Sequence, residues 1–247
     1  MNDIAILVLT SEKYEDLIPG FLICFFKNIK VKFKLYLQIY NLKIFDSRIT
    51  NIYIKTNNWS DSLIMSLDHI EEKYVLIILE DIYIVNFDQD IFFECFQNLQ
   101  RNNGDFLNIL GYPTGNDIGQ SIDKVNSKTP YSITAIGVWK KDSLKNILKT
   151  GENPWKFEIL GSKRALKKNL LLYVTKKNLL EHKNMVEKGK WVKNNLIWGL
   201  QKKLISTSNV RKINSALIRK IKIYIFEFLI KIPFNKYIFL LIYKLRK

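Results

Sequence analysis

Two adjacent acids, Glu80 and Asp81, directly follow the apolar run Tyr74–Leu79. A short apolar run without alternation is typical of a strand buried on both faces, as in a sheet covered by helices. Open α/β sheets bind ligands in the crevice beyond the carboxyl ends of their strands. Carboxylates at that point can hold a divalent cation against a diphosphate, or bind a sugar hydroxyl. A solvated turn is the alternative, and the position at the strand end favours a binding site.

A second pair, Trp155 and Glu158, follows Asn153-Pro154. Asparagine before proline predicts a helix start, and a spacing of three residues places both side chains on one helix face. A tryptophan ring can pack against the apolar face of a sugar, and a nearby carboxylate can accept the proton of an attacking hydroxyl. The alternative is a core tryptophan beside a surface acid.

A third candidate combines His182 with the segment Lys188-Gly189-Lys190-Trp191. A flexible basic turn with glycine can close over a diphosphate, where its lysines neutralise the leaving group. His182 could complete a metal site, although a surface or hydrogen-bonded histidine is the more common role, and the same holds for His69. The sequence contains no P-loop, GxGxxG motif, zinc cluster or catalytic triad pattern.

The elements that must position these residues alternate between strand and helix and are joined by short links. This order is typical of a parallel, three-layer α/β sheet. The polar stretch 111–128 is long for a connection and predicts a functional loop. Apolar periodicity and capping residues predict strands at 4–9, 34–40, 52–55, 74–79, 106–110 and 131–139, and helices at 11–28, 60–70, 86–101, 142–149 and from 153 onward.

Positive charge is concentrated at one end of the chain. The formal net charge is +16 over 247 residues, with −3 over residues 1–160 and +19 over residues 161–247. Within residues 211–247, cations flank aromatic and aliphatic clusters, and Pro233 divides the segment. This pattern predicts amphipathic helices that bind an anionic membrane surface. A packed helical hairpin with solvated lysines is the alternative, and the apolar residues disfavour a nucleic-acid partner.

The sequence also predicts a compartment and a domain division. Cys24 and Cys95 form no CxxC motif, which favours free thiols in a reducing compartment. The N-terminus lacks a basic start with a long apolar core, and no stretch approaches the roughly 18 apolar residues of a membrane span. We expect an α/β domain at residues 1–200 and a membrane-association segment at 201–247, in a cytoplasmic protein peripheral at the inner face of the cell membrane.

Several short motifs also form a recognisable set: residues 9–16, Trp59 with Ser62 and Leu63, and the segments 79–83, 131–135 and 151–158. Together they resemble bacterial nucleotide-sugar-dependent glycosyltransferases of the GT-A type, as found in capsule and O-antigen biosynthesis. The resemblance covers roughly residues 3–200 and implies a GT-A-like, Rossmann-type three-layer sandwich. The family usually has two acids separated by one residue, whereas Glu80 and Asp81 are adjacent. A Mg²⁺ or Mn²⁺ site at Asp81 and a metal-free donor pocket both stay open.

The resemblance implies an inverting transfer from a nucleotide sugar to a glycan acceptor, one that the basic segment suggests is lipid-linked. Tyr14 would stack on the base and Asp16 would accept a base N–H, although a capped helix start explains Asp16 equally well. Glu158 would be the catalytic base and Asp81 would organise the donor. The implied donor-binding residues are Thr10, Tyr14, Asp16, Trp59, Ser62, Glu80, Asp81, Lys188 and Lys190, and the acceptor-binding residues are Trp155 and Glu158.

Two other functions are compatible with the same sequence. A non-catalytic protein that binds membrane surfaces on an α/β scaffold would need the basic segment but no nucleotide. An enzyme acting on nucleic acid would show binding that falls steeply with salt.

Overall fold

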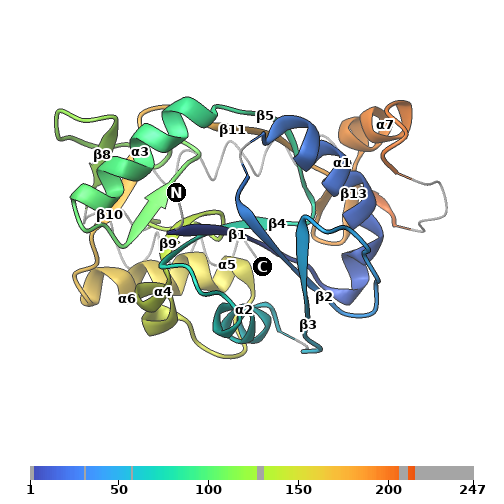
Figure 1. The fold of residues 1–247 in the computed structure, drawn as a ribbon, viewed down its shortest axis with the longest axis horizontal. Helices are drawn as coiled ribbons and strands as arrows, with labels where there is room; N and C mark the ends of the chain where they lie inside the picture. The colour runs from blue at the N-terminus through green and yellow to red at the C-terminus, as the bar shows by residue number, and fades with distance from the viewer. Residues whose placement is uncertain (1–2, 31, 57, 127–130, 206–210, 215–247) are drawn as a thin grey trace.

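The computed structural model describes residues 3–30, 32–56, 58–126, 131–205 and 211–214 (Figure 1). Its centre is a mixed sheet of nine strands among these residues. In spatial order the strands are β3 (Ile49–Tyr53), β2 (Lys34–Ile39), β1 (Ile4–Leu9), β4 (Tyr74–Leu79), β9 (Gly137–Lys140), β6 (Phe106–Asn108), β10 (Leu172–Thr175), β8 (Ile122–Val125) and β7 (Gly115–Asp117).

The apolar run before the two acids forms β4, as predicted. It pairs in parallel with β1, from Ile4 opposite Tyr74 to Leu9 opposite Leu79. Successive side chains of both strands enter different hydrophobic clusters on the two faces of the sheet. Because each face is covered, neither strand shows the alternation of a half-exposed strand.

Helices cover both faces, which confirms the three-layer arrangement (Figure 1). The cluster on one face contains apolar residues of α1 (Ile18–Asn28) and α3 (Gln89–Arg101). The cluster on the other contains residues of α2 (Trp59–Asp68), α4 (Lys141–Ile147) and the helical stretch made of α5 (Pro154–Lys156), η2 (Phe157–Gly161) and α6 (Ser162–Lys167). The predicted helix start at Pro154 is confirmed.

The prediction of a parallel sheet is right for β3, β2, β1 and β4 and for the pair β6–β10, and wrong for the pairings of β9, β8 and β7. Strand β9 is antiparallel to both β4 and β6. The chain leaves β6 and enters β9 at the same edge of the sheet, since Leu110, just after β6, and Ile136, just before β9, line the same cavity. Strand β9 therefore starts at the edge where its neighbours end and runs back between them.

Several local predictions differ from the structure. The expected loop at 111–128 contains the hairpin β7–β8, which extends the central sheet. The expected strand at 131–139 is a strand only from Gly137. The segment after the acids is β5 (Ile82–Phe87), paired with β11 (Leu180–Asn184), although no element was predicted at 82–85 and the helix was expected to begin at 86. The backbone N–H and C=O groups of these residues form their hydrogen bonds in a second sheet, and no local sequence pattern predicts that pairing.

A third sheet combines β12 (Val186–Glu187), β13 (Lys190–Val192) and β14 (Ile213–Asn214), and α7 (Lys193–Gln201) follows β13. Most of the predicted membrane-association segment, including Pro233, lies outside the described residues. Across the described ranges, no helix is both long and apolar enough to cross a bilayer. Cys24 and Cys95 are buried free thiols.

Candidate functional site

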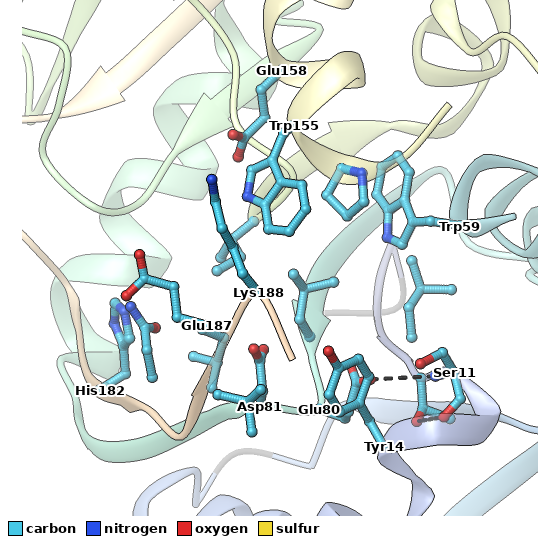
Figure 2. Close-up of a pocket in the computed structure, with 18 of the residues that line it drawn as sticks. Ser11, Tyr14, Trp59, Glu80, Asp81, Trp155, Glu158, His182, Glu187 and Lys188 are labelled. Atoms are coloured by element: carbon cyan, nitrogen blue, oxygen red, sulfur yellow. Dashed lines mark hydrogen bonds between the residues drawn. The ribbon is translucent and has the colours of Figure 1, made fainter. Parts of the chain in front are cut away.

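A cavity of about 570 Å³ opens at the carboxyl ends of β1 and β4, where Leu9 and Leu79 form part of its lining (Figure 2). This is the edge at which the two acids were expected to bind a ligand. The predicted residues in the lining of the cavity come from five separate stretches of sequence. Of the predicted residues, Thr10, Tyr14, Trp59, Ser62, Glu80, Asp81, Trp155, Glu158, His182 and Lys188 line it.

The acid pair lies in the turn between β4 and β5. Glu80 is only 6% exposed, and its Oε1 accepts a hydrogen bond of 3.3 Å from the backbone N–H of Ser11. Burial and the neighbouring carboxylate of Asp81 raise the pKa of Glu80, and burial raises the pKa of Asp81 to about 7. Neither acid forms an ion pair with any residue that the structure describes. A cation or a hydrogen-bond donor on a ligand would stabilise the ionised pair.

Tyr14, in η1 (Glu12–Leu17), faces the acids across the cavity floor (Figure 2). Its pKa is raised by burial first and then by the negative charges of Asp81 and Glu80. Asp16, two residues further on, does not line the cavity. Its carboxylate instead forms a bidentate ion pair with Arg211, at 2.6 Å and 2.5 Å.

The predicted basic turn is a tight β-hairpin rather than an open flexible loop. Lys188 and Gly189 connect β12 to β13 with φ values of +50° and +74°, the left-handed conformation that two-residue hairpin turns of type I′ require. Lys188 lines the cavity and points toward Trp155 and Glu158 (Figure 2), whereas Lys190 is exposed and outside it.

His182 lines the cavity near the same hairpin (Figure 2). Its Nδ1 lies 2.8 Å from the carbonyl oxygen of Leu180, which can only accept, so Nδ1 carries the proton and Nε2 is the basic nitrogen. No group of three or more histidines, cysteines or acids within the described ranges is arranged to hold a metal ion. His69 is exposed at the end of α2 and does not line the cavity.

Glu158 is fixed on the opposite wall. It is 9% exposed, its Oε1 accepts a 3.0 Å hydrogen bond from the Ala135 backbone N–H, and its Oε2 accepts one from the Tyr131 hydroxyl. Its own carbonyl accepts from the Ser162 hydroxyl at 2.6 Å. The helix is locally a π-helix from Phe157 to Gly161, a form that is often found at functional sites.

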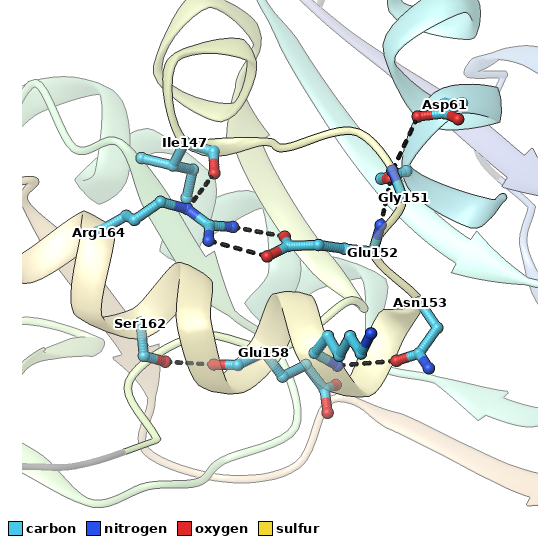
Figure 3. Close-up of polar contacts among 10 residues, drawn as sticks. Asp61, Ile147, Gly151, Glu152, Asn153, Glu158, Ser162 and Arg164 are labelled. Atoms are coloured by element: carbon cyan, nitrogen blue, oxygen red, sulfur yellow. Dashed lines mark hydrogen bonds and ion pairs between the residues drawn. The ribbon is translucent and has the colours of Figure 1, made fainter. Parts of the chain in front are cut away.

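A buried ion pair holds this helix in place (Figure 3). Glu152 and Arg164 form two parallel contacts of 2.9 Å and 2.5 Å, and Nε of Arg164 donates to the carbonyl of Ile147 at 2.6 Å. The backbone N–H of Glu152 donates to Oγ of Ser60 at 2.9 Å, and its carbonyl accepts from the Ser60 N–H at 3.1 Å. These contacts fix the start of α5 beside the start of α2.

As a result, Trp59 and Trp155 line one cavity although they are far apart in sequence (Figure 2). The Trp59 ring also packs on Phe157, with the ring centroids 5.3 Å apart.

Comparison with known proteins identifies similar folds but no sequence family. No family model matches the sequence, and no curated protein matches it. S. aureus TarS (residues 1–349), solved with UDP-GlcNAc, aligns with a TM-score of 0.52 and 16% identity over 72% of this chain and 57% of that chain. The mannosyltransferase PcManGT from Pyrobaculum calidifontis, solved with GDP-Man and Mn²⁺, aligns with a TM-score of 0.53 and 11% identity over 76% of this chain and 58% of that one.

The 2-C-methyl-D-erythritol 4-phosphate cytidylyltransferase of Francisella tularensis aligns over 81% of this chain and 99% of its own, with 11% identity and a TM-score of 0.46. TarS and PcManGT align with TM-scores above 0.5. At their low sequence identities, these alignments show a shared α/β fold with a mixed central sheet. The chain spans less than two thirds of the length of both of those structures.

Some cavity residues were missed by sequence reasoning. Tyr40 lies one residue beyond β2, and Asn58 directly precedes α2. The rule that ligands bind beyond strand ends, applied to β2 as it was to β4, would have found Tyr40. Asn184 and Glu187 line the cavity from β11 and β12, whose course no local pattern indicates.

Proposed function

We propose that this protein is a glycosyltransferase of the GT-A type that moves a sugar from a nucleoside-diphosphate donor to a hydroxyl acceptor. The observation that carries the proposal is one cavity with two chemically different walls. One wall carries Glu80, Asp81 and Tyr14, and the other carries Trp155 and Glu158. A transferase needs both: a wall for a charged, aromatic donor and a wall with a sugar platform and a base.

The donor would occupy the wall formed by the carboxyl ends of β1 and β4. Tyr14 and Trp59 offer aromatic faces, and Thr10 and Ser62 offer hydroxyl groups at the same edge. Lys188 would contact the diphosphate and neutralise the charge that develops on it as the glycosidic bond breaks.

A divalent cation fits this wall only with help from the donor. The described residues contain no three-ligand cluster. Mg²⁺ and similar hard cations often need just one or two carboxylates, with phosphate oxygens and water completing the shell. Asp81 would hold such an ion, with Nε2 of His182 in the same cavity. When bound, the ion would offset the charge of the diphosphate.

Glu158 would act as the base of a single displacement. The acceptor hydroxyl gives its proton to the Glu158 carboxylate while its oxygen forms a bond to the anomeric carbon. The bond from that carbon to the phosphate oxygen breaks on the opposite face, so the configuration inverts. Hydrogen bonds from the Ala135 N–H and the Tyr131 hydroxyl to its two oxygens hold the carboxylate in place.

The proposed acceptor, pathway and location of the protein rest on the sequence. The basic segment 211–247, with its interleaved apolar clusters, suits attachment to an anionic membrane surface. We therefore propose a lipid-linked glycan acceptor, a role in capsule or O-antigen biosynthesis, and a cytoplasmic protein peripheral at the inner face of the cell membrane.

A transfer assay with Glu158→Gln tests the proposal. Wild-type protein, a panel of UDP and GDP sugars and detergent-dispersed lipid-linked acceptors should yield a glycosylated product. Glu158→Gln should lower kcat by about 10²–10⁴-fold, the usual contribution of a general base, with donor affinity retained. Glu181→Gln, which changes an exposed acid of β11 outside the cavity, is the control and should keep full activity.

Three outcomes would contradict the proposal. Unchanged transfer by Glu158→Gln would remove that residue from the role of base. Liposome binding without any nucleotide binding would favour the non-catalytic membrane protein. Release of pyrophosphate from a nucleoside triphosphate, without sugar transfer, would indicate a nucleotidyltransferase.

A further inference from the structure

We propose that Arg211 is a positioning residue for the donor wall, joining Tyr14 to the hairpin that presents Lys188. This inference rests on the proposed function, because it assigns that wall to a nucleotide sugar. Arg211 begins the last described segment, 211–214, and is separated by 195 residues from its ion-pair partner Asp16. No sequence pattern connects the two.

The Arg211 guanidinium makes contacts in several directions. It pairs with both oxygens of Asp16 and donates to the Lys13 carbonyl, which fixes it on η1. It also lies 5.1 Å from the ring centroid of Tyr14 and 5.1 Å from that of Trp191. Its side chain is 13% exposed, so these charge and ring contacts are shielded from water. Arg211 therefore joins η1 to β13.

Backbone hydrogen bonds extend this connection to the acid pair. The N–H of Met185 donates to the carbonyl of Asp81 at 2.8 Å, and the N–H of Val192 donates to the carbonyl of Met185 at 3.0 Å. Next to Val192, the N–H of Trp191 donates to the carbonyl of Lys212 at 2.8 Å. The segment that carries Arg211 is thus connected through β13 and then Met185 to the turn that carries Asp81.

The base and the tip of the hairpin are held differently. Val186, Trp191 and Val192 are buried and seat the base in the core. The tip, Lys188 and Gly189, contributes no buried apolar side chain. It lies against Tyr14 instead: a Cβ placed on Gly189 would be 3.8 Å from the Tyr14 hydroxyl. In agreement, a hydrogen bond from the Gly189 backbone lowers the pKa of that hydroxyl, against the stronger effect of burial. The orientation of Tyr14, set by Arg211, therefore decides where the tip places Lys188.

The test compares Arg211→Ala and Arg211→Lys with Arg48→Ala. Arg48 is a matched control, since it also forms a bidentate pair with an aspartate, Asp46, and lies 3.5 Å from the ring centroid of Phe26, but it is outside the cavity. Two quantities are measured in the full chain: the dissociation constants for UDP and GDP, and hydrogen exchange of the amides of residues 186–192.

Arg211→Ala should accelerate exchange at Gly189 and Trp191 and weaken nucleotide binding by about tenfold or more, as expected for loss of a charge-assisted contact network. Arg211→Lys should be intermediate, because lysine keeps the charge but lacks the planar fork. Arg48→Ala should change neither quantity. Unchanged exchange and affinity in Arg211→Ala, or equal losses in Arg48→Ala, would overturn the inference. Wild-type protein that binds neither UDP nor GDP would count against the donor site itself, while faster exchange in Arg211→Ala would still support the contact between Arg211 and the hairpin.

Discussion

Two pairs of ionisable groups, one in the lining of the cavity and one outside it, differ in how their charge is balanced. Glu152 and Arg164 carry opposite charges, meet in two parallel contacts, and Nε of Arg164 donates to a backbone carbonyl (Figure 3). Glu80 and Asp81 carry charge of one sign and have no ion-pair partner among the residues that the structure describes. The first pair stabilises the fold, and the second is suited to a partner from outside the chain.

This contrast distinguishes acids that hold the structure together from acids that bind. The Glu152–Arg164 pair lies one loop away from the cavity and fixes the starts of α2 and α5. The Glu80–Asp81 pair lies in the cavity lining, where ionisation is unfavourable without a ligand. Burial alone does not identify a functional acid; burial without a compensating charge does so far better.

The largest expected effect comes from breaking the balanced pair. Arg164→Met leaves Glu152 buried without its partner, which should lower the free energy of unfolding by about 3–5 kcal/mol. Lys145→Met is the control, since it removes a partly exposed lysine paired with the exposed Asp68 and should cost less than about 1 kcal/mol. Urea unfolding of both variants measures the difference. Equal losses would mean that the buried pair has no special structural role.

Asp81→Asn should act in the opposite direction and depend on pH. Burial raises the pKa of Asp81 from 3.8 to about 7, so the folded state holds its proton more tightly than the unfolded state. Wild-type stability should therefore fall as the pH rises from about 4 to about 7, while the amide side chain of the variant has no proton to lose. The variant should gain little near pH 4 and at most about 4 kcal/mol at pH 8, at about 1.4 kcal/mol per pKa unit.

Thermal and urea unfolding between pH 4 and pH 8 measure this gain. A variant that becomes less stable than wild type as the pH rises would mean that a cation within the chain compensates Asp81. The contrast with the Glu152–Arg164 pair would then disappear.

Sequence reasoning succeeded where a single segment contains the information. The unbroken apolar run Tyr74–Leu79 predicts a strand with two covered faces, and Asn153-Pro154 predicts a helix start, because both depend on neighbouring residues. Glu80, Trp59 and Glu158, which come from three separately predicted motifs, line one cavity.

It did not anticipate features that depend on distant segments. Strand β9 is antiparallel because of the path the chain takes after β6, and β5 is a strand because β11 pairs with it. The ion pairs of Arg164 and Arg211 depend on side chains that only the folded chain brings together. Asp16 is an instructive case. The resemblance implied a contact to the nucleotide base, a capped helix start explained the residue equally well, and in the structure its carboxylate binds Arg211.

The most direct test of the central claim is calorimetric titration of wild-type protein and Asp81→Asn with UDP-GlcNAc and GDP-mannose, with and without MnCl₂. If the unbalanced acids form a donor wall, at least one nucleotide sugar binds the wild type, and the substitution weakens that binding by about tenfold or more, equivalent to about 1.4 kcal/mol. Equal binding by both proteins, or no binding of either nucleotide sugar, would contradict the assignment of this wall to a donor.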